Sequence, residues 1–225
     1  MKNERNAEIK NYICSTFIKE DEAFLAVESS SSKEDLPNIA VPEHVGKILY
    51  LFAKLQQPKR ILEIGTLAGY STLWLAKGAP EAKITTIEYQ PKHAAIAREN
   101  FKATNLGNNI NLIEDNALEV LTRLKNENES AFDLIFLDAN KEDYPAYLPL
   151  LLALSRTGTL ILTDNLIPKA LEINSPHPND IVACKTYEYN ALLASHPNLD
   201  TTVITTIVGN NGRVDAMGVS YVKFL

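Results

Sequence analysis

Cysteine and tryptophan are scarce in this sequence of 225 residues. The two cysteines, Cys14 and Cys184, lie far apart and stand in no CxxC or Cys/His ligand spacing. Neither a disulfide framework nor a structural zinc site is therefore indicated, and we expect two buried, reduced thiols. The single tryptophan, Trp74, falls on a predicted helix, so we expect it in the hydrophobic core.

Long hydrophobic runs and blocks of basic residues are also missing. The longest apolar run, LPLLLAL at residues 148–154, is far shorter than the roughly 20 residues that cross a bilayer. The first ten residues, MKNERNAEIK, lack the apolar stretch of a secretory signal. With a net charge of −6 and no Lys/Arg cluster, the chain lacks the cationic surface that nucleic acids require. We expect a soluble, cytoplasmic protein that binds neither membranes nor nucleic acids.

Short runs rich in β-branched residues alternate with helical patterns from Arg60 onward. The strands are expected at RILEI, AKITTIE, NINLIE, FDLIFLD and GTLILTD. The linking helices are expected at Tyr70–Lys77, Pro91–Thr104, Ala117–Lys125 and Tyr144–Leu154. Five strands separated by helices predict a parallel sheet with right-handed crossovers.

The end of the chain breaks this alternation. The strands predicted at Asp200–Val208 and Val214–Phe224 are joined only by Gly209–Arg213, which is too short to cross a sheet, so they should form an antiparallel hairpin. The expected fold class is α/β, a doubly wound Rossmann-like fold with a seven-stranded, mostly parallel sheet and a C-terminal antiparallel hairpin. The chain length and the 45% of hydrophobic residues favour one domain over residues 1–225.

Helices are also predicted before the first strand, at Glu4–Lys19, Glu22–Val27 and Pro42–Gln56. The serine run Ser29–Ser32 between the second and third of these helices is expected to be a mobile loop that can order over a ligand.

A glycine-containing turn follows the first predicted strand. In open α/β sheets, ligands bind at the carboxyl ends of the strands, and here the sequence reads EIGTLAGYS, with Gly65 and Gly69 before a helix. A dinucleotide loop of the form GxGxxG would have glycine where this chain has Leu67. The turn favours a ligand without a diphosphate, such as S-adenosylmethionine, although a tight turn without a ligand is an open alternative.

An acidic residue, Glu88, ends the second predicted strand, 23 positions after Gly65. A carboxylate here can accept both ribose hydroxyls of an adenosine, which serves NAD and S-adenosylmethionine equally. It can also be a helix-start group before Pro91.

Oxygen-bearing side chains end the fourth and fifth predicted strands. Adjacent parallel strands would place Asp138, Asp164 and Asn165 side by side. Three oxygen donors without His or Cys suit a hard cation, either Mg²⁺ or one of the alternatives Mn²⁺ and Ca²⁺. Each piece alone is also compatible with a structural role, because Asp-Asn is a common turn signal.

At this point the sequence resembles the metal-dependent small-molecule O-methyltransferases, which include the caffeoyl-CoA and catechol O-methyltransferases. The resemblance runs in order through IAVPEHVG, ILEIGTLAGYST, TIEYQP, LIEDNALEVL, DLIFLDANKEDY, TDN and VDAMGVSYVK. The fold of that family also ends in an antiparallel hairpin. The resemblance implies transfer of a methyl group from S-adenosylmethionine to a hydroxyl of a small molecule, catechol-like or with vicinal hydroxyls, by a homodimer.

The resemblance also implies roles for individual residues. It assigns to the methyl donor Val41 (methionine part), Glu63, Gly65, Thr66, Tyr70 and Ser71 (donor loop), Glu88 (ribose), Ala117 (adenine) and Asp138. It assigns Asp138, Asp164 and Asn165 to the metal, and Lys141, with Asp138, to catalysis. Lys141 would be the general base, and the alternative is a surface charge at a helix start. The helices of residues 1–58 and the loop Pro168–Asp180 are expected to cover the substrate.

The sequence departs from the family pattern near the expected acceptor site. Members that act on plant phenolics carry a Trp soon after the Asp-Asn pair, where this chain has Leu166–Lys169, and Asn140 replaces a second Asp. The acceptor therefore stays open.

Two other functions are compatible with an α/β fold of this kind. An NAD-type oxidoreductase or nucleotide-binding module is disfavoured by Leu67 and by the terminal hairpin. A catalytically silent binding protein is disfavoured because the expected metal ligands, Glu88 and Lys141 are all present.

Overall fold

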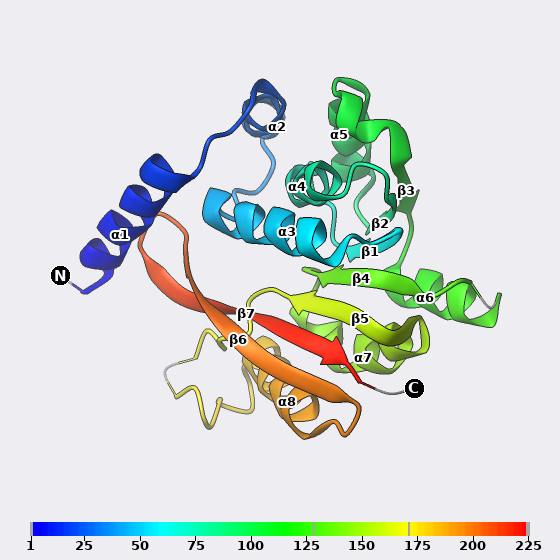
Figure 1. Ribbon diagram of the computed structural model, residues 1–225. Helices are drawn as coiled ribbons and strands as arrows, with labels where there is room; N and C mark the ends of the chain where they lie inside the picture. The colour runs from blue at the N-terminus through cyan, green and yellow to red at the C-terminus, as the bar shows by residue number, and fades with distance from the viewer. Residues whose placement is uncertain (1, 128, 171, 224–225) are drawn as a thin grey trace.

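The computed structural model describes residues 2–127, 129–170 and 172–223. Its centre is a seven-stranded sheet with the strand order β3-β2-β1-β4-β5-β7-β6 (Figure 1). The strands β1 to β5 are parallel, whereas β7 runs antiparallel to both β5 and β6. The predicted fold class is confirmed, including the terminal hairpin; Phe224, the last residue of the predicted final strand, lies outside the described residues.

The elements follow the predicted alternation. The strands are β1 (Arg60–Ile64), β2 (Lys83–Glu88), β3 (Ile110–Glu114), β4 (Phe132–Leu137), β5 (Ser155–Thr163), β6 (Leu199–Val208) and β7 (Arg213–Val222). The helices are α1 (Lys2–Phe17), α2 (Glu22–Lys33), α3 (Glu43–Gln56), α4 (Tyr70–Gly78), α5 (Pro91–Lys102), α6 (Ala117–Asn126), α7 (Tyr144–Ala153) and α8 (Ile181–Ser195), with 3-10 turns η1 (Asn105–Asn109) and η2 (Lys141–Asp143). None of the helices in the described ranges is long and apolar enough to cross a membrane.

Two hydrophobic cores cover the two faces of the sheet. Because successive strand residues point to opposite faces, Ile61 packs into the core beneath α3, α4 and α5, and Leu62 into the core beneath α6, α7 and α8 (Figure 1). Trp74 is fully buried in the first core and stacks on Phe24 with ring centroids 4.2 Å apart. The prediction that Trp74 belongs to the core is confirmed.

Three expectations about local structure are wrong. The serine run Ser29–Ser32 is helical, because α2 continues to Lys33 and Ser31 Oγ donates to the Val27 carbonyl at 2.8 Å. Helix α8 was not predicted, although its buried residues Ala183, Thr186, Tyr189 and Leu193 recur every three or four positions. The cysteines are free, as expected, but half-buried and not buried.

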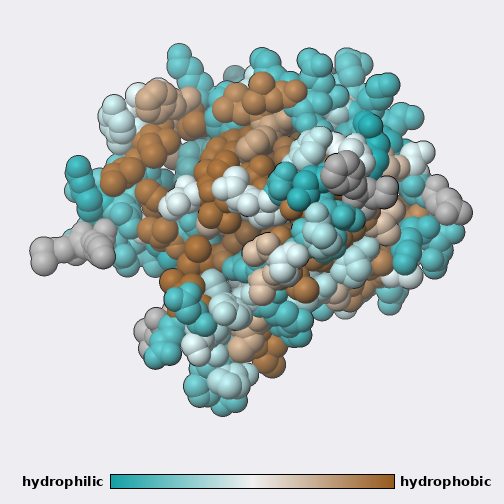
Figure 2. All heavy atoms as spheres, turned by 60° about the horizontal axis from the view of Figure 1, so that its bottom comes forward, coloured by the Kyte–Doolittle hydropathy of each residue, from teal (hydrophilic) through white to brown (hydrophobic). Residues whose placement is uncertain are grey.

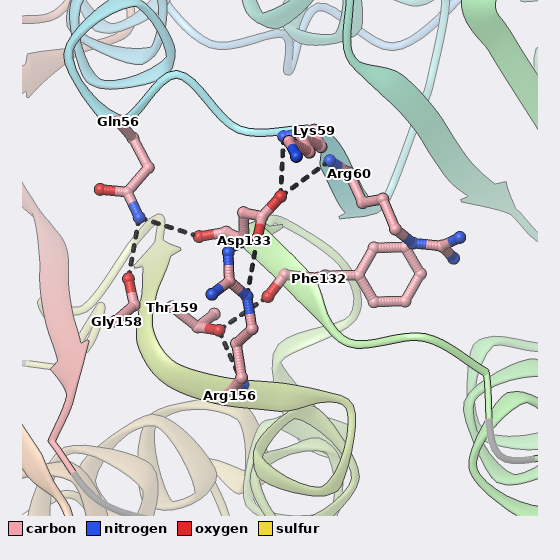
Figure 3. Close-up of polar contacts among 8 residues, drawn as sticks. All are labelled: Gln56, Lys59, Arg60, Phe132, Asp133, Arg156, Gly158 and Thr159. Carbon is pink, nitrogen blue, oxygen red and sulfur yellow. Dashed lines mark hydrogen bonds and ion pairs between the residues drawn. The ribbon is translucent and has the colours of Figure 1, made fainter.

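A polar network ties three strands together at the amino edge of the sheet (Figure 3). Asp133 Oδ2 accepts the backbone N–H groups of Lys59 and Arg60 at 2.7 and 3.0 Å, and its Oδ1 accepts Arg156 Nε at 2.9 Å. Gln56 Nε2 donates to the carbonyl of Gly158 at 2.8 Å. Because β1, β4 and β5 are joined at this edge, their opposite ends are held in register.

Candidate active site

The carboxyl ends of β2, β1, β4 and β5 lie side by side. Ile64 pairs with both Ile87 and Leu137, and Leu137 pairs with Thr163. The pairing continues one residue further, since Asp138 N donates to the Ile64 carbonyl at 2.9 Å and Asp164 N to the Leu137 carbonyl at 3.0 Å. The structure therefore brings Glu88, Gly65, Asp138 and Asp164 to one edge, as the alternating pattern predicts.

The backbone conformation explains why the turn after β1 contains glycine at position 65. Gly65 has φ +97°, and a Cβ added there would lie 2.1 Å from the carbonyl oxygen of Asp138. Glycine is therefore required both by the left-handed conformation and by the close approach of β4. Leu67 also has a left-handed φ of 48°, and its side chain packs against the core beneath α3, α4 and α5. A leucine side chain thus stands where a dinucleotide loop needs glycine.

Glu63, expected in the donor loop, is fully buried among hydroxyl groups. Its carboxylate accepts Ser71 Oγ at 2.7 Å and Thr86 Oγ1 at 2.6 Å, and Thr72 Oγ1 also donates to it. Burial raises the pKa of Glu63 to about 7, against the opposing effect of these hydroxyl donors. Sequence reasoning missed Thr72 and Thr86; in the observed register of β1 and β2, Thr86 lies opposite Glu63.

Glu88 holds the glycine loop in this structure. Its Oε2 accepts the backbone N–H groups of Thr66 and Leu67 at 3.2 and 2.8 Å, and its Oε1 accepts Gln90 N at 2.8 Å. The hydroxyls of Thr66 and Thr86 are 2.6 Å apart. The residues assigned to the ribose and to the donor loop therefore form one connected structure.

The remaining residues assigned to the donor lie around this loop. Tyr70 is buried at the start of α4, and its hydroxyl donates to Glu20, in the link between α1 and α2, which sequence reasoning missed. Val41 is buried just before α3 in the same core as Tyr70. Ala117 is the half-buried first residue of α6, a helix that Asn116 caps by accepting the N–H of Leu118 at 2.9 Å.

Asp138, Lys141 and Asp164 are three ionisable side chains that follow the ends of β4 and β5. Lys141 Nζ donates to Asp138 Oδ1 at 2.7 Å and lies 5.4 Å from the ring centroid of Tyr144. Asp164 is 2% exposed, and its Oδ1 is buried without a hydrogen-bond partner. Burial, followed by the negative charge of Asp138, raises the pKa of Asp164 to about 8. A buried oxygen without a donor can be satisfied by a water, a proton or a cation beside it.

Asn165 follows Asp164 in the left-handed conformation, with φ 61°. Its Nδ2 donates to Asp215 Oδ2 at 3.1 Å. Two carboxylates and one amide carbonyl are the ligand types of a hard divalent cation, so the residues present fit the metal that the family implies. Asp215, fully buried on β7, was missed by sequence reasoning; the signal was an acidic residue within an otherwise buried strand pattern.

Comparison with known proteins identifies the class. Residues 15–211 match the O-methyltransferase family. A catechol O-methyltransferase of Niastella koreensis is 38% identical over 226 residues, which cover 99% of this chain and 100% of the relative. A catechol O-methyltransferase of Mycobacterium tuberculosis is also 38% identical, over 91% of each chain.

Solved structures of similar proteins support the same class. An O-methyltransferase from Bacillus cereus in complex with SAH superposes with a TM-score of 0.91 at 35% identity, covering 98% of this chain and all of the other. The O-methyltransferase TomG from Streptomyces achromogenes, in complex with SAM, gives 0.90 at 33% identity over 99% of both chains. The chain belongs to the O-methyltransferase family, and the predicted enzyme class, an S-adenosylmethionine-dependent O-methyltransferase, is confirmed.

Proposed function

We propose that this enzyme methylates a hydroxyl of a small catechol-like or vicinal dihydroxy compound with the help of a divalent cation, Mg²⁺ before Mn²⁺ or Ca²⁺. The observation that carries the proposal is the buried, unpartnered Asp164 Oδ1 at the strand end beside Asp138 and Asn165. Two relatives of similar length, 38% identical, bear the name catechol O-methyltransferase, which supports the acceptor class.

The methyl donor would lie along the glycine loop. Glu88 would exchange its bonds to the loop amides for the ribose hydroxyls, and Ala117 would border the adenine. Val41, Gly65 and Asp138 would line the methionine end. Glu63, Thr66, Tyr70 and Ser71 would act as the hydrogen-bonded frame of the loop.

The acceptor would lie beside the three metal ligands. A divalent cation held by Asp138, Asp164 and Asn165 would lower the pKa of a bound hydroxyl and fix two neighbouring substrate oxygens. Lys141 already lies within hydrogen-bond distance of Asp138, so its amine reaches the ligand cluster. With the cation bound to Asp138, Lys141 in its neutral form would take the hydroxyl proton as general base, and Asp138 would hold the cation beside the lysine amine.

Replacement of Lys141 tests the proposal. We expect Lys141→Ala to lower kcat for methylation of a catechol panel by about 10²–10⁴-fold, the usual contribution of a general base, with little change in donor affinity by calorimetry. Lys185→Ala is a matched control, because Lys185 makes a similar ion pair with Glu188, at 2.8 Å, on the exposed side of α8. Unchanged turnover in Lys141→Ala would place the base elsewhere, and full activity in EDTA would contradict a metal.

The segments around the site would determine which acceptor molecule binds. We propose that residues 1–225 form one domain and that the enzyme acts in the cytoplasm. The helices of residues 1–58 and the loop Pro168–Asp180 would cover the substrate. Helix α2 is held near the glycine loop, because Ser30 Oγ donates to Asn100 Oδ1 at 3.0 Å and Asn100 Nδ2 to the Ala68 carbonyl at 2.9 Å. The loop has no helix or strand in its described residues; Leu171 lies outside them.

A further inference from the structure

A buried carboxylate on the terminal hairpin lies directly behind the Asp-Asn turn. Asp215 of β7 is 0% exposed. Its Oδ1 accepts the backbone N–H groups of Ile167 and Ala216 at 3.0 and 2.8 Å. Its Oδ2 accepts Asn165 Nδ2 at 3.1 Å and an Arg213 guanidinium nitrogen at 2.5 Å. Four donors therefore share the two oxygens of one side chain, with two donors on each oxygen.

The chemistry of this contact decides which way the Asn165 amide points. An ionised carboxylate only accepts hydrogen bonds, so the NH₂ group of Asn165 must face Asp215. The carbonyl oxygen of the amide is then directed away from Asp215. A cation can be bound by an amide carbonyl but not by an amide NH₂ group. This orientation therefore leaves the carbonyl oxygen of Asn165, the one atom of the amide that can bind a cation, free of Asp215.

We propose that Asp215 is a positioning residue that holds Asn165 with its carbonyl oxygen toward the metal. The inference rests on the proposed function, because it requires the cation beside Asp138, Asp164 and Asn165. Asp215 itself would touch neither the substrate nor the metal, because protein donors occupy both of its oxygens. It acts through Asn165 and through the backbone of the turn, where Leu166 N also donates to the Ala216 carbonyl at 2.9 Å.

A single substitution should reverse the amide. In Asp215→Asn, the side-chain oxygen is required by the N–H groups of Ile167 and Ala216, so the new NH₂ group takes the place of Oδ2. This NH₂ group would face the NH₂ group of Asn165, which must rotate and present its carbonyl to residue 215. The NH₂ group of Asn165 would then face the cation.

The double substitution Asn165→Asp with Asp215→Asn exchanges donor and acceptor between these two side chains and restores their contact. Arg213 loses its Oδ2 acceptor in the single and the double variant alike, so it does not account for a difference between them. The NH₂ group at position 215 then donates to one carboxylate oxygen at position 165, and the other oxygen faces the cation. Asn165→Asp alone adds a carboxylate ligand, so the single variant is measured beside the double variant, and recovery beyond its own gain is expected only if the contact orients the ligand.

The experiment measures Mn²⁺ binding without substrate, by the loss of the electron paramagnetic resonance signal of free Mn²⁺. We expect Asp215→Asn to raise the Kd by about 10–100-fold, the usual effect of losing an outer-shell partner, and the double variant to return it to within a few fold of wild type. Donor affinity by calorimetry should change little in either variant.

Asp133→Asn is the matched control, because Asp133 is also a buried aspartate that accepts two backbone N–H groups, at the opposite edge of the sheet (Figure 3). It should lower the Tm and leave the Kd for Mn²⁺ unchanged. An unchanged Kd in Asp215→Asn, or a folded double variant that does not recover, would overturn the inference alone. A wild-type protein that binds no Mn²⁺ would overturn the proposed metal as well.

Discussion

At the scale of single residues, Glu63 is the most unusual group of the donor loop. Its fully buried carboxylate has a pKa raised to about 7, although hydroxyl groups donate to both oxygens. The protonated form is therefore favoured by folding. Stability from this group is fully present below its ordinary pKa of 4.5 and is lost as the pH rises through 7.

Glu63→Gln should flatten this dependence. The substitution keeps a carbonyl acceptor for the hydroxyls and removes the titration. Between pH 4.5 and 7.5, the free energy of unfolding of the wild type should fall by about 3 kcal/mol more than that of the variant. Urea unfolding at several pH values measures the difference, and parallel curves for the two proteins would contradict it.

The sequence predicted Glu63 and one of its partners, Ser71, but not the other two. A residue that ends a strand is located by the alternation of strands and helices alone. The hydroxyls of Thr72 and Thr86 meet Glu63 from a helix and a neighbouring strand, and only the packed register brings them within hydrogen-bond distance.

At the scale of elements, the junction of β1 and β4 depends on Gly65. Gly65→Ala places a Cβ at 2.1 Å from the Asp138 carbonyl, in addition to the cost of φ +97°. Gly158 is a matched control on β5, because it has φ +93° and its nearest neighbour would be the Tyr221 hydroxyl at 3.8 Å.

We expect Gly158→Ala to cost about 1–2 kcal/mol, the conformational term alone. Gly65→Ala should cost a further 1–3 kcal/mol or so from overpacking and should also weaken Mn²⁺ binding, because Asp138 must move. Denaturant unfolding and Mn²⁺ titration of both variants measure these effects. Equal costs would show that the approach of β4 does not require glycine.

Elements also show where local sequence misleads. The run of four serines predicted a loop, but the segment is helical: the hydroxyls of Ser30 and Ser31 donate to the Val27 carbonyl one turn back, and Ser30 also donates to Asn100. Helix α8 follows a Pro- and Asn-rich segment with strong turn signals. Its exposed side also carries apolar residues, such as Ile181, Tyr187 and Leu192, so no amphipathic period marks the helix in the sequence.

At the scale of the whole molecule, one face is open and apolar. In Figure 1, no helix of the described residues covers β6 and β7 on the face of the sheet that carries α3. In Figure 2, apolar side chains gather between α1, at the left, and the middle of the molecule. Exposed apolar residues on the neighbouring elements α1, α3 and β7 include Phe17, Leu51, Leu55 and Tyr221. Such a face is typical of a surface that another protein covers, and a second copy of the chain is the proposal that follows from the homodimer implied by the sequence resemblance.

Leu55→Glu should therefore shift the protein from dimer to monomer, because a charge would be buried at the interface. Leu192→Glu is the control, since Leu192 is an exposed leucine on α8, which covers the other face of the sheet. Light scattering after size-exclusion chromatography measures the mass. A monomeric wild-type protein, or two dimeric variants, would contradict the proposal.

The sequence by itself determined the order of the elements and the edge at which the chemistry lies. Alternating strands and helices force parallel pairing, and parallel pairing brings the strand ends Glu88, Asp138 and Asp164 to one edge. The tertiary structure decided how these residues are held. The second strand of the terminal hairpin, β7, lies next to β5, which brings Asp215 to Asn165 across 50 positions. Local patterns carry no information about such a contact, because it depends on which hairpin strand enters the sheet.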